Sequence, residues 1–557
     1  MVRRLLATCF VLFVLALCPP ARAAGSLLAE TPGAGAVPLA AGGVAADIVV
    51  DPADHTVVHL AAQDLAEDIE RVTGVRPAVK KPGDALSEYA VLIGALGKSA
   101  PADAARNDAD IAGQWESFAI SVEDAPLPGV KRALVIAGSD RRGTAYGVYE
   151  LSREIGVSLW YWWADVTPTH RDALYIRNTA QTYGPPSVKY RGIFINDEKF
   201  GLHPWAAQTF EPENGGIGPN TYEKVFELLL RLRGNYLWPA MKQCTRAFNS
   251  FEANAQLADD YAIVMGSSHC EHLLRNNIDE WPREGEGAWD YTVNRDNILA
   301  YWAARLETNG QFENIYTLGM RGADDKAMPG GGTLDEQTER LSQIIRDQRG
   351  LLAQYVNPDV TQAPQILSPY KEVLDLYRNG LDVPEDVTIL WTDDNYGYIR
   401  KLPNEQERKR SGGHGVYYHI SYSGNPHDYL WLDTTPPALM WYELKKAYDH
   451  GARTIWVLNA GDIKPMEPGI DFFMQLAWNA ENTGPDAAFE FLMKWPAALF
   501  GRPGNTHFNA AVSALLGNYF QLASRRRPEL MGYNERDFPN TLIQDPDFSL
   551  WHYGDEV

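Results

Sequence analysis

The sequence predicts an α/β protein whose main domain is a (β/α)8 barrel, the TIM barrel, preceded by a small α/β domain. Between residues 187 and 465, eight short apolar runs alternate with stretches of helical spacing. The runs are Tyr190–Asn196, Asn235–Pro239, Ala262–Ser267, Asn314–Met320, Gln365–Pro369, Val387–Thr392, Val416–Tyr422 and Thr454–Asn459. Eight strands alternating with helices over roughly 270 residues fit a barrel. A doubly wound open sheet is the alternative, but it usually has fewer strands and often a phosphate-binding turn.

Two segments precede the first predicted domain. Residues 1–23 match a secretory signal peptide, with Arg3 and Arg4 as the charged region, Leu5–Leu17 as the apolar region and an A-x-A cleavage site. The apolar run is shorter than the roughly 18 residues that a membrane span needs. We therefore expect a secreted or periplasmic protein. Residues 24–45 are rich in Ala, Gly and Pro, which predicts a flexible lead-in.

Residues 46–180 are predicted to form the N-terminal α/β domain. Apolar runs of strand length alternate here with helical spacing. The predicted elements are the strands Asp47–Val50, Tyr89–Ile93 and Ala133–Ile136 and the helices His59–Val72 and Gly143–Gly156. A Gly-Pro-Pro run shortly after residue 180 breaks any regular element and marks the domain boundary.

The barrel is assigned to residues 187–465. Clear helices fill several intervals between its strands, at Tyr222–Leu232, Leu334–Tyr355 and Pro437–His450. After residue 465 the chain becomes helical and rich in Trp, Phe and Leu. We assign residues 466–557 to a helical domain and expect that domain to be truncated.

Charge and cysteine usage exclude several classes of function. The net charge of −22 repels nucleic acid and anionic membranes, so neither is an expected partner. After the signal peptide only Cys244 and Cys270 remain, too few for a disulfide framework. No CxxC or HExxH spacing and no Gly-rich phosphate loop occurs. We therefore expect no metal and no cofactor.

Polar residues gather where the predicted barrel strands end, which is where TIM-barrel chemistry takes place. The clusters are Asn196–Glu198, Trp238, Ser268–Glu271, Arg321–Asp325, Tyr370–Glu372, Asp393–Tyr396, Tyr417 with His419 and Tyr422, and Asn459–Asp462. Any single Asp or Asn here could simply cap a helix. Capping does not require an Arg, a His or a Trp, however, so the clusters together indicate an active site.

Clustered carboxyl groups at this rim suit glycoside hydrolysis, in which one carboxyl protonates the leaving oxygen and another attacks or activates water. The candidates are Asp197, Asp325, Glu372, Asp393 and Asp394. A nearby Arg opposes protonation of the carboxyl that it touches. We therefore expect Arg321 to face the substrate and not the acid. A Ser/His/Asp triad is disfavoured because no GxSxG elbow is present, and two-metal hydrolysis is a weaker alternative.

Long blocks of the sequence resemble glycoside hydrolase family 115. They are Tyr190–Glu198, Gly201–Trp205, Leu237–Met241, Gly319–Gly322, Pro369–Val373, Trp391–Tyr398, Gly415–Tyr422 and Asn459–Glu467. The resemblance implies an inverting α-glucuronidase that removes 4-O-methyl-glucuronic or glucuronic acid linked α-1,2 to xylose. The implied substrates are glucuronoxylan and glucuronic-acid-decorated xylo-oligosaccharides. Because members commonly dimerise, a homodimer stays open.

The resemblance also implies roles for the rim residues. We expect Glu372 to be the general acid and Asp394 or Asp393 to activate water. Arg321 and His269 are candidates for holding the uronate carboxylate, and Trp238 and Tyr422 for shaping the sugar subsite. Asn196, Asp197, Asp325 and Asn395 complete the implied pocket.

Two alternatives remain. The chain could be a truncated, catalytically weak relative that only binds xylan. It could also be another exo-acting glycosidase on the same architecture, which likeness of fold alone does not exclude.

Overall fold

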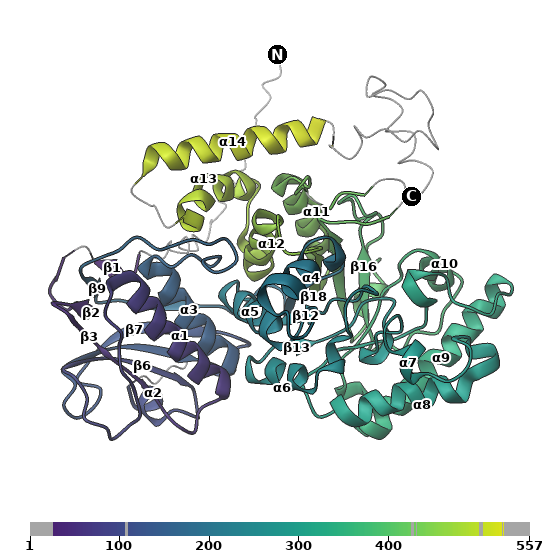
Figure 1. Cartoon of the computed structure of the whole chain (residues 1–557), viewed down its shortest axis with the longest axis horizontal. Coiled ribbons are helices and arrows are strands. Elements are labelled where there is room, and N and C mark those ends of the chain that lie inside the picture. Colours follow the sequence, from purple (N-terminus) through teal and green to yellow (C-terminus); the bar gives the residue numbers. More distant parts are fainter. Residues whose placement is uncertain are drawn as a thin grey trace, which may run out of the picture.

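The computed structural model of the chain describes residues 26–29, 31–105, 110–424, 428–430, 432–500, 505–525 and 527. The predicted signal peptide, residues 1–23, lies outside these ranges. Figure 1 shows the N-terminal sheets and helices beside a central barrel, with helices α12 to α14 across one end.

The eight predicted strands form a parallel barrel. They are β11 (Tyr190–Phe194), β12 (Tyr236–Trp238), β13 (Val264–Met265), β14 (Tyr316–Thr317), β15 (Gln365–Leu367), β16 (Thr388–Thr392), β17 (His414–His419) and β18 (Ala452–Asn459). Their order is β13-β12-β11-β18-β17-β16-β15-β14, and a parallel bridge between Met265 and Asn314 joins the two ends of the sheet. Each predicted run overlaps one strand, so the predicted fold is confirmed.

Alternating side chains of the strands divide between the barrel interior and the surrounding helices. Phe194 and Trp238 fill the interior, whereas their neighbours Ile193 and Leu237 pack outward. The helices are α4 (Leu202–Trp205), α5 (Pro219–Arg231), α6 (Glu252–Asp260), α7 (Trp281–Glu284), α8 (Tyr291–Asn309), α9 (Leu334–Tyr355), α10 (Glu372–Arg378) and α11 (Pro437–Asp449). The range of α9 equals the predicted one, because a Thr333–Glu336 capping box fixes its start.

The N-terminal region contains a six-stranded sheet in the order β10-β7-β8-β6-β4-β5. Its elements are β4 (Asp47–Val50), α1 (Thr56–Thr73), β5 (Val79–Lys80), β6 (Tyr89–Ala95), α2 (Ala100–Ala105), β7 (Phe118–Asp124), β8 (Arg132–Gly138), α3 (Arg141–Ile155) and β10 (Ala180–Tyr183). Buried apolar side chains of α1 and α3 belong to the same core as the strands and the outer layer of the barrel.

The flexible lead-in expected for residues 24–45 is wrong for the part that the structure describes. This part forms β1 (Leu28–Ala29), β2 (Val37–Ala41) and β3 (Val44–Ala45), which join β9 (Leu174–Ile176) in an antiparallel sheet. Val37 and Leu39 lie two residues apart and are fully buried in the main core. This alternation outweighs the Ala, Gly and Pro content around it.

Helices α12 (Glu467–Asn479), α13 (Ala487–Phe500) and α14 (Thr506–Arg525) follow the barrel. Asp471 of α12 accepts hydrogen bonds from the indoles of Trp160 and Trp495, at 3.2 and 3.0 Å, which ties the helices to the N-terminal region. None of the described helices combines the length and the apolar character that a membrane span requires.

Candidate active site

The loops that follow the barrel strands hold their backbone in unusual conformations. Residues other than glycine adopt positive φ in five of them, at Leu273, Leu274, Asp324, Asp325, Lys371, Asn395 and Ile463. Such conformations cost energy for L-residues and gather at functional sites. These conformations indicate that the functional site lies at the C-terminal mouth of the barrel.

Arg321 lies at the centre of this mouth and is only 2% exposed. Its Nε and Nη2 donate to the two carboxylate oxygens of Glu372, at 3.0 and 2.7 Å, and its Nη1 donates to Asp325. Paired parallel hydrogen bonds between a guanidinium and a carboxylate are among the strongest in proteins. Three charged groups from the ends of β14 and β15 are thus brought together.

This arrangement corrects the expectation that Arg321 faces the substrate and not the acid. A buried guanidinium is costly unless its donors are paired with acceptors. Glu372 is the first residue of α10 and Asp325 lies four residues beyond Arg321, so both carboxylates are within reach. Both oxygens of Glu372 accept from Arg321, so the carboxylate is held by the guanidinium in this structure.

Asp325 also connects Arg321 to His269 and Lys371. Its carboxylate lies 2.9 Å from His269 Nε2 and accepts from Lys371 Nζ at 2.7 Å. Burial lowers the pKa of His269 well below its ordinary value, and the positive charges of Arg321 and Lys371 lower it further. His269 is therefore neutral near pH 7. Its Nδ1 is buried and has no hydrogen-bond partner among the described residues.

A second chain of contacts reaches the ends of β16 and β17. Tyr370 donates its hydroxyl to the Asn395 side chain at 2.7 Å and stacks on the His419 ring. His419 Nδ1 lies 2.6 Å from Asp393, whose other oxygen accepts from the Gly397 amide at 2.9 Å. Asn395 and Asp393 are thus joined to the same mouth, but both oxygens of Asp393 are already in use.

Asp394 holds its own loop together. One oxygen accepts from the amides of Tyr396 and Tyr398, both at 3.1 Å, and the other from Arg400 at 3.0 Å. Burial raises the pKa of Asp394, and the neighbouring Asp393 carboxylate raises it further. The structure therefore gives Asp394 a loop-stabilising role and no free oxygen for a water molecule.

Tyr417 packs at the floor of the mouth against rings from two other strand ends and against His419 of its own strand, β17. Its ring centroid lies 5.6 Å from His269, 6.1 Å from Tyr370 and 4.4 Å from His419. Trp238 lies 5.2 Å from the same ring. The aromatic side chains that the sequence places on separate strands thus converge.

Trp238, expected to shape the sugar subsite, lies below the mouth. It is fully buried in the barrel interior, where its indole donates to the Tyr236 hydroxyl at 2.7 Å. Its ring packs against Phe194 and Tyr417. Trp238 therefore supports the Tyr417 floor from below.

Buried carboxyl groups gather at the ends of β11 and β18. Asp197 accepts from Ser421 at 3.1 Å, and burial raises its pKa. Burial also raises the pKa of Glu198 to about 8 and that of Asp462 to about 7, with the Asp197 charge contributing to both. One oxygen of each of these three carboxyls is buried without a hydrogen-bond partner in the described part of the chain.

The sequence assigned a role only to Asp197 in this group. Glu198 and Asp462 stood at predicted strand ends, but helix capping explained them equally well. Glu198 is fully buried, whereas Asp462 is partly buried. For Glu198, two consecutive acidic residues directly after a buried strand would have been the available signal.

Asn196 and Tyr422 lie on the same side of the mouth. The backbone N–H of Asn196 donates to the Gly461 carbonyl at 3.2 Å, which joins the loops after β11 and β18. Tyr422 forms a buried cluster with Tyr396 and Tyr429. Tyr422 therefore stands at the rim, with its ring 5.9 Å from His419.

The described residues contain two other features that could bind a ligand, a group of possible metal ligands and a small cavity. His269, Cys270 and Asp325 lie close enough to ligate one metal ion, but Arg321 and Lys371 already neutralise Asp325. Two cations beside a shared carboxylate disfavour a third. We therefore assign no metal there.

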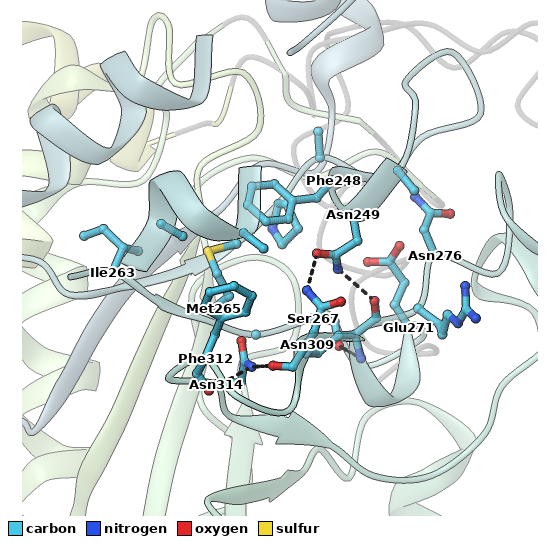
Figure 2. Close-up of a pocket in the computed structure, with 18 of the residues that line it drawn as sticks. Phe248, Asn249, Ile263, Met265, Ser267, Glu271, Asn276, Asn309, Phe312 and Asn314 are labelled. Atoms are coloured by element: carbon cyan, nitrogen blue, oxygen red, sulfur yellow. Dashed lines mark hydrogen bonds between the residues drawn. The ribbon is translucent and has the colours of Figure 1, made fainter. Parts of the chain in front are cut away.

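A cavity beside β13, lined by residues such as Phe248, Met265, Ser267 and Glu271, has a volume of about 20 Å³ (Figure 2). That volume suits one water molecule. The cavity is too small for a sugar.

The chain is similar to known glycoside hydrolases. The family model described as "Glycosyl hydrolase family 115" matches residues 183–530. A solved structure described as a family GH115 4-O-methyl-α-glucuronidase with specificity for decorated arabinogalactans shares 42% identity and superposes with a TM-score of 0.81. The match covers 89% of this chain and 64% of that one. The chain therefore spans about two thirds of that relative's length.

A more distant solved structure shows the fold alone. It is a GH138 enzyme targeting pectin rhamnogalacturonan II, with 13% identity and a TM-score of 0.52, over 86% of this chain and 69% of that one. Among curated proteins, no significant match was found.

Proposed function

The chain belongs to glycosyl hydrolase family 115, and on this basis we propose that it removes glucuronic acid or 4-O-methyl-glucuronic acid from a decorated glycan. The bond that we propose is the α-1,2 linkage to xylose in glucuronoxylan, cleaved with inversion. The related solved structure is described as specific for decorated arabinogalactans. A glucuronic-acid-decorated arabinogalactan is therefore the second candidate substrate.

The Arg321–Glu372 pair is the observation that carries the proposal. A uronic acid has a planar carboxylate, and a guanidinium in a water-poor site binds such a group through two parallel hydrogen bonds. Glu372 and Asp325 occupy those donors, and their side chains are 29% and 27% exposed. A substrate carboxylate can therefore reach Arg321 by exchanging with one of them.

This exchange also explains how Glu372 could become the acid. Once the uronate takes over the Arg321 donors, Glu372 loses its guanidinium partner and gains a negatively charged neighbour. Both changes favour its protonated form. Glu372 would then donate its proton to the glycosidic oxygen.

Inversion requires a second carboxylate, about 6.5–9.5 Å from the acid, to activate water. Both oxygens of Asp393 and of Asp394 are engaged within the protein. Asp197 has one oxygen without a partner among the described residues. We therefore propose Asp197 as the base in place of Asp393 or Asp394, on the support of this oxygen.

The test is to incubate the purified protein with glucuronoxylan and with decorated arabinogalactan and to quantify released uronic acid by chromatography. We expect release from at least one of them and none from neutral α-hexosides, and NMR of the first product should show the β-anomer. Binding to a xylan affinity gel without any release would instead support a binding-only relative.

Export is proposed on the N-terminal sequence alone. N-terminal sequencing of the mature protein should begin after Ala23 in the periplasmic or culture fraction. Recovery of the chain only in the cytoplasmic fraction, with Met1 intact, would contradict export.

A further inference from the structure

A large cleft opens beside the barrel mouth, between the segment after α3 and the loops that follow β11 and β18. Its volume is about 1130 Å³, more than the roughly 300–1,000 Å³ of typical small-ligand sites. Its lining includes the aromatic side chains Tyr161, Trp162, Trp163, Trp205 and Phe210. We call it the aromatic cleft.

Three partly exposed rings form its wall. Trp205 and Phe210 stack nearly parallel, with centroids 4.9 Å apart and an interplanar angle of 11°. Trp162 meets both rings edge-on, at 5.9 and 5.1 Å. Rings fixed in this way lose little entropy on binding, and an exposed apolar patch bordered by polar groups marks a binding surface.

The two cations that line the aromatic cleft, Arg71 and Lys464, are already paired with carboxylates. Arg71 donates to Asp68 and Glu67 at 2.5 and 3.0 Å. Lys464 lies 3.3 Å from Glu467. Both cations of the described lining are thus paired, so the cleft fits an uncharged ligand better than a second uronate.

The aromatic cleft shares Asp462 with the carboxyl group cluster at the ends of β11 and β18. Gly201 leaves no room for a Cβ against Asp462, so the loops after β11 and β18 touch there. Asp462 accepts from the Leu202 amide, and the Asp197 charge raises the pKa of Asp462. Asp462 therefore links the cleft to the carboxyl cluster that contains Asp197, the proposed base.

We propose that the aromatic cleft binds the neutral main chain of the decorated glycan, with its sugar rings against Trp205, Phe210 and Trp162. This inference rests on the proposed function, because it assigns the leaving-group side of the same reaction. The cleft would add binding energy from sugars remote from the scissile bond, energy that a short substrate cannot supply.

The test compares kcat/KM on a one-xylose substrate, glucuronosyl-xylose, with that on a glucuronic-acid-decorated xylohexaose. For Trp205→Ala, the ratio of long to short should fall about tenfold from that of the unaltered protein, a loss of about 1.4 kcal/mol. Phe210→Ala should lower the ratio in the same direction. The control Tyr442→Ala removes an exposed aromatic ring on α11 and should leave the ratio as it was.

The outcomes separate the two proposals. No release of acid by the unaltered protein, either from these two substrates or from decorated arabinogalactan, would refute the proposed function itself. Release with an equal loss on both substrates, or with no loss, for both cleft variants would overturn the aromatic cleft as a main-chain site. A shift in oligomeric state for Trp205→Ala, measured by light scattering, would identify a second copy of the chain as the occupant and also overturn it.

Discussion

Two buried arginines of this molecule meet carboxylates in different ways. Arg191 joins the barrel to the N-terminal region, and neither its side chain nor that of Glu116 is exposed. Arg191 also donates to the carbonyls of Val188 and Arg233, while Glu116 accepts from Arg142 as well. Arg191 and Glu116, which we call the interface cluster, are therefore closed off from solvent, and each has several hydrogen-bond partners.

The mouth cluster around Arg321 is open on one side. Its carboxylates Glu372 and Asp325 are more than a quarter exposed, and Asp325 has positive φ. Polar atoms of His269 and Asp197 lie buried nearby without partners in the described part of the chain. The comparison teaches that a buried ion pair is structural where it is closed and exchangeable where it borders solvent.

The largest effect should come from Glu372→Gln, which removes the proposed acid without changing its shape. We expect kcat to fall by about 10²–10⁴-fold with little change in Tm. Glu407→Gln, which removes the carboxylate paired with Lys401 outside the mouth, is the matched control and should keep its activity. Near-normal turnover by Glu372→Gln would show that another group is the acid.

Arg191→Met should show the opposite pattern, with a loss of stability and retention of activity. It deprives Glu116 of one of its two arginines, and breaking a buried pair costs about 3–5 kcal/mol. Calorimetry should show a Tm lower by several degrees, while kcat per folded molecule stays within about threefold. Arg76→Met, at an exposed pair, should barely shift Tm. A large loss of kcat in Arg191→Met would show that the Arg191 cluster also supports catalysis, which would contradict its purely structural role.

Arg321→Lys should have a smaller effect on catalysis than loss of the acid. Lysine keeps the positive charge but not the planar guanidinium, so it cannot donate two parallel hydrogen bonds to the incoming carboxylate. We expect kcat/KM to fall by about tenfold or more, with a higher KM as well as a lower kcat. An unchanged KM on the uronic substrate would place the uronate elsewhere.

The smallest expected effect concerns pH. Burial raises the pKa of Glu198 to about 8, so the folded state binds a proton that the unfolded state releases above about pH 4.5. Stability should therefore fall as pH rises from 5 to 8. In Glu198→Gln this fall should be smaller by on the order of 1 kcal/mol or more, measured by urea unfolding at both pH values. If the free energy of unfolding falls equally with pH in both proteins, titratable groups other than Glu198 cause the fall.

Much of the fold could be predicted from the sequence, because barrel strands buried on both faces appear as continuous apolar runs. The missed elements carry weaker signals. In β7, Phe118–Asp124, the apolar run is interrupted by Ser121 and ends in acidic residues. In β1 to β3, small residues dilute the alternation of Val37 and Leu39.

The candidate site was predictable as a set of residues but not as a set of contacts. Position at a strand end placed Arg321 and Glu372 at the same mouth, yet their pairing depends on how two loops 51 residues apart in the chain fold. The inward position of Trp238 could have been inferred, because Tyr236 lies two residues before it on the same face of β12. Distinguishing the free oxygen of Asp197 from the engaged oxygens of Asp394 requires the structure.

A crystal structure with bound glucuronic acid tests the central claim most directly. We expect the sugar carboxylate to accept two hydrogen bonds from Arg321, with Glu372 turned away toward the anomeric carbon. A sugar bound at the mouth with the Arg321–Glu372 pair intact would contradict the carboxylate exchange on which the mechanism depends.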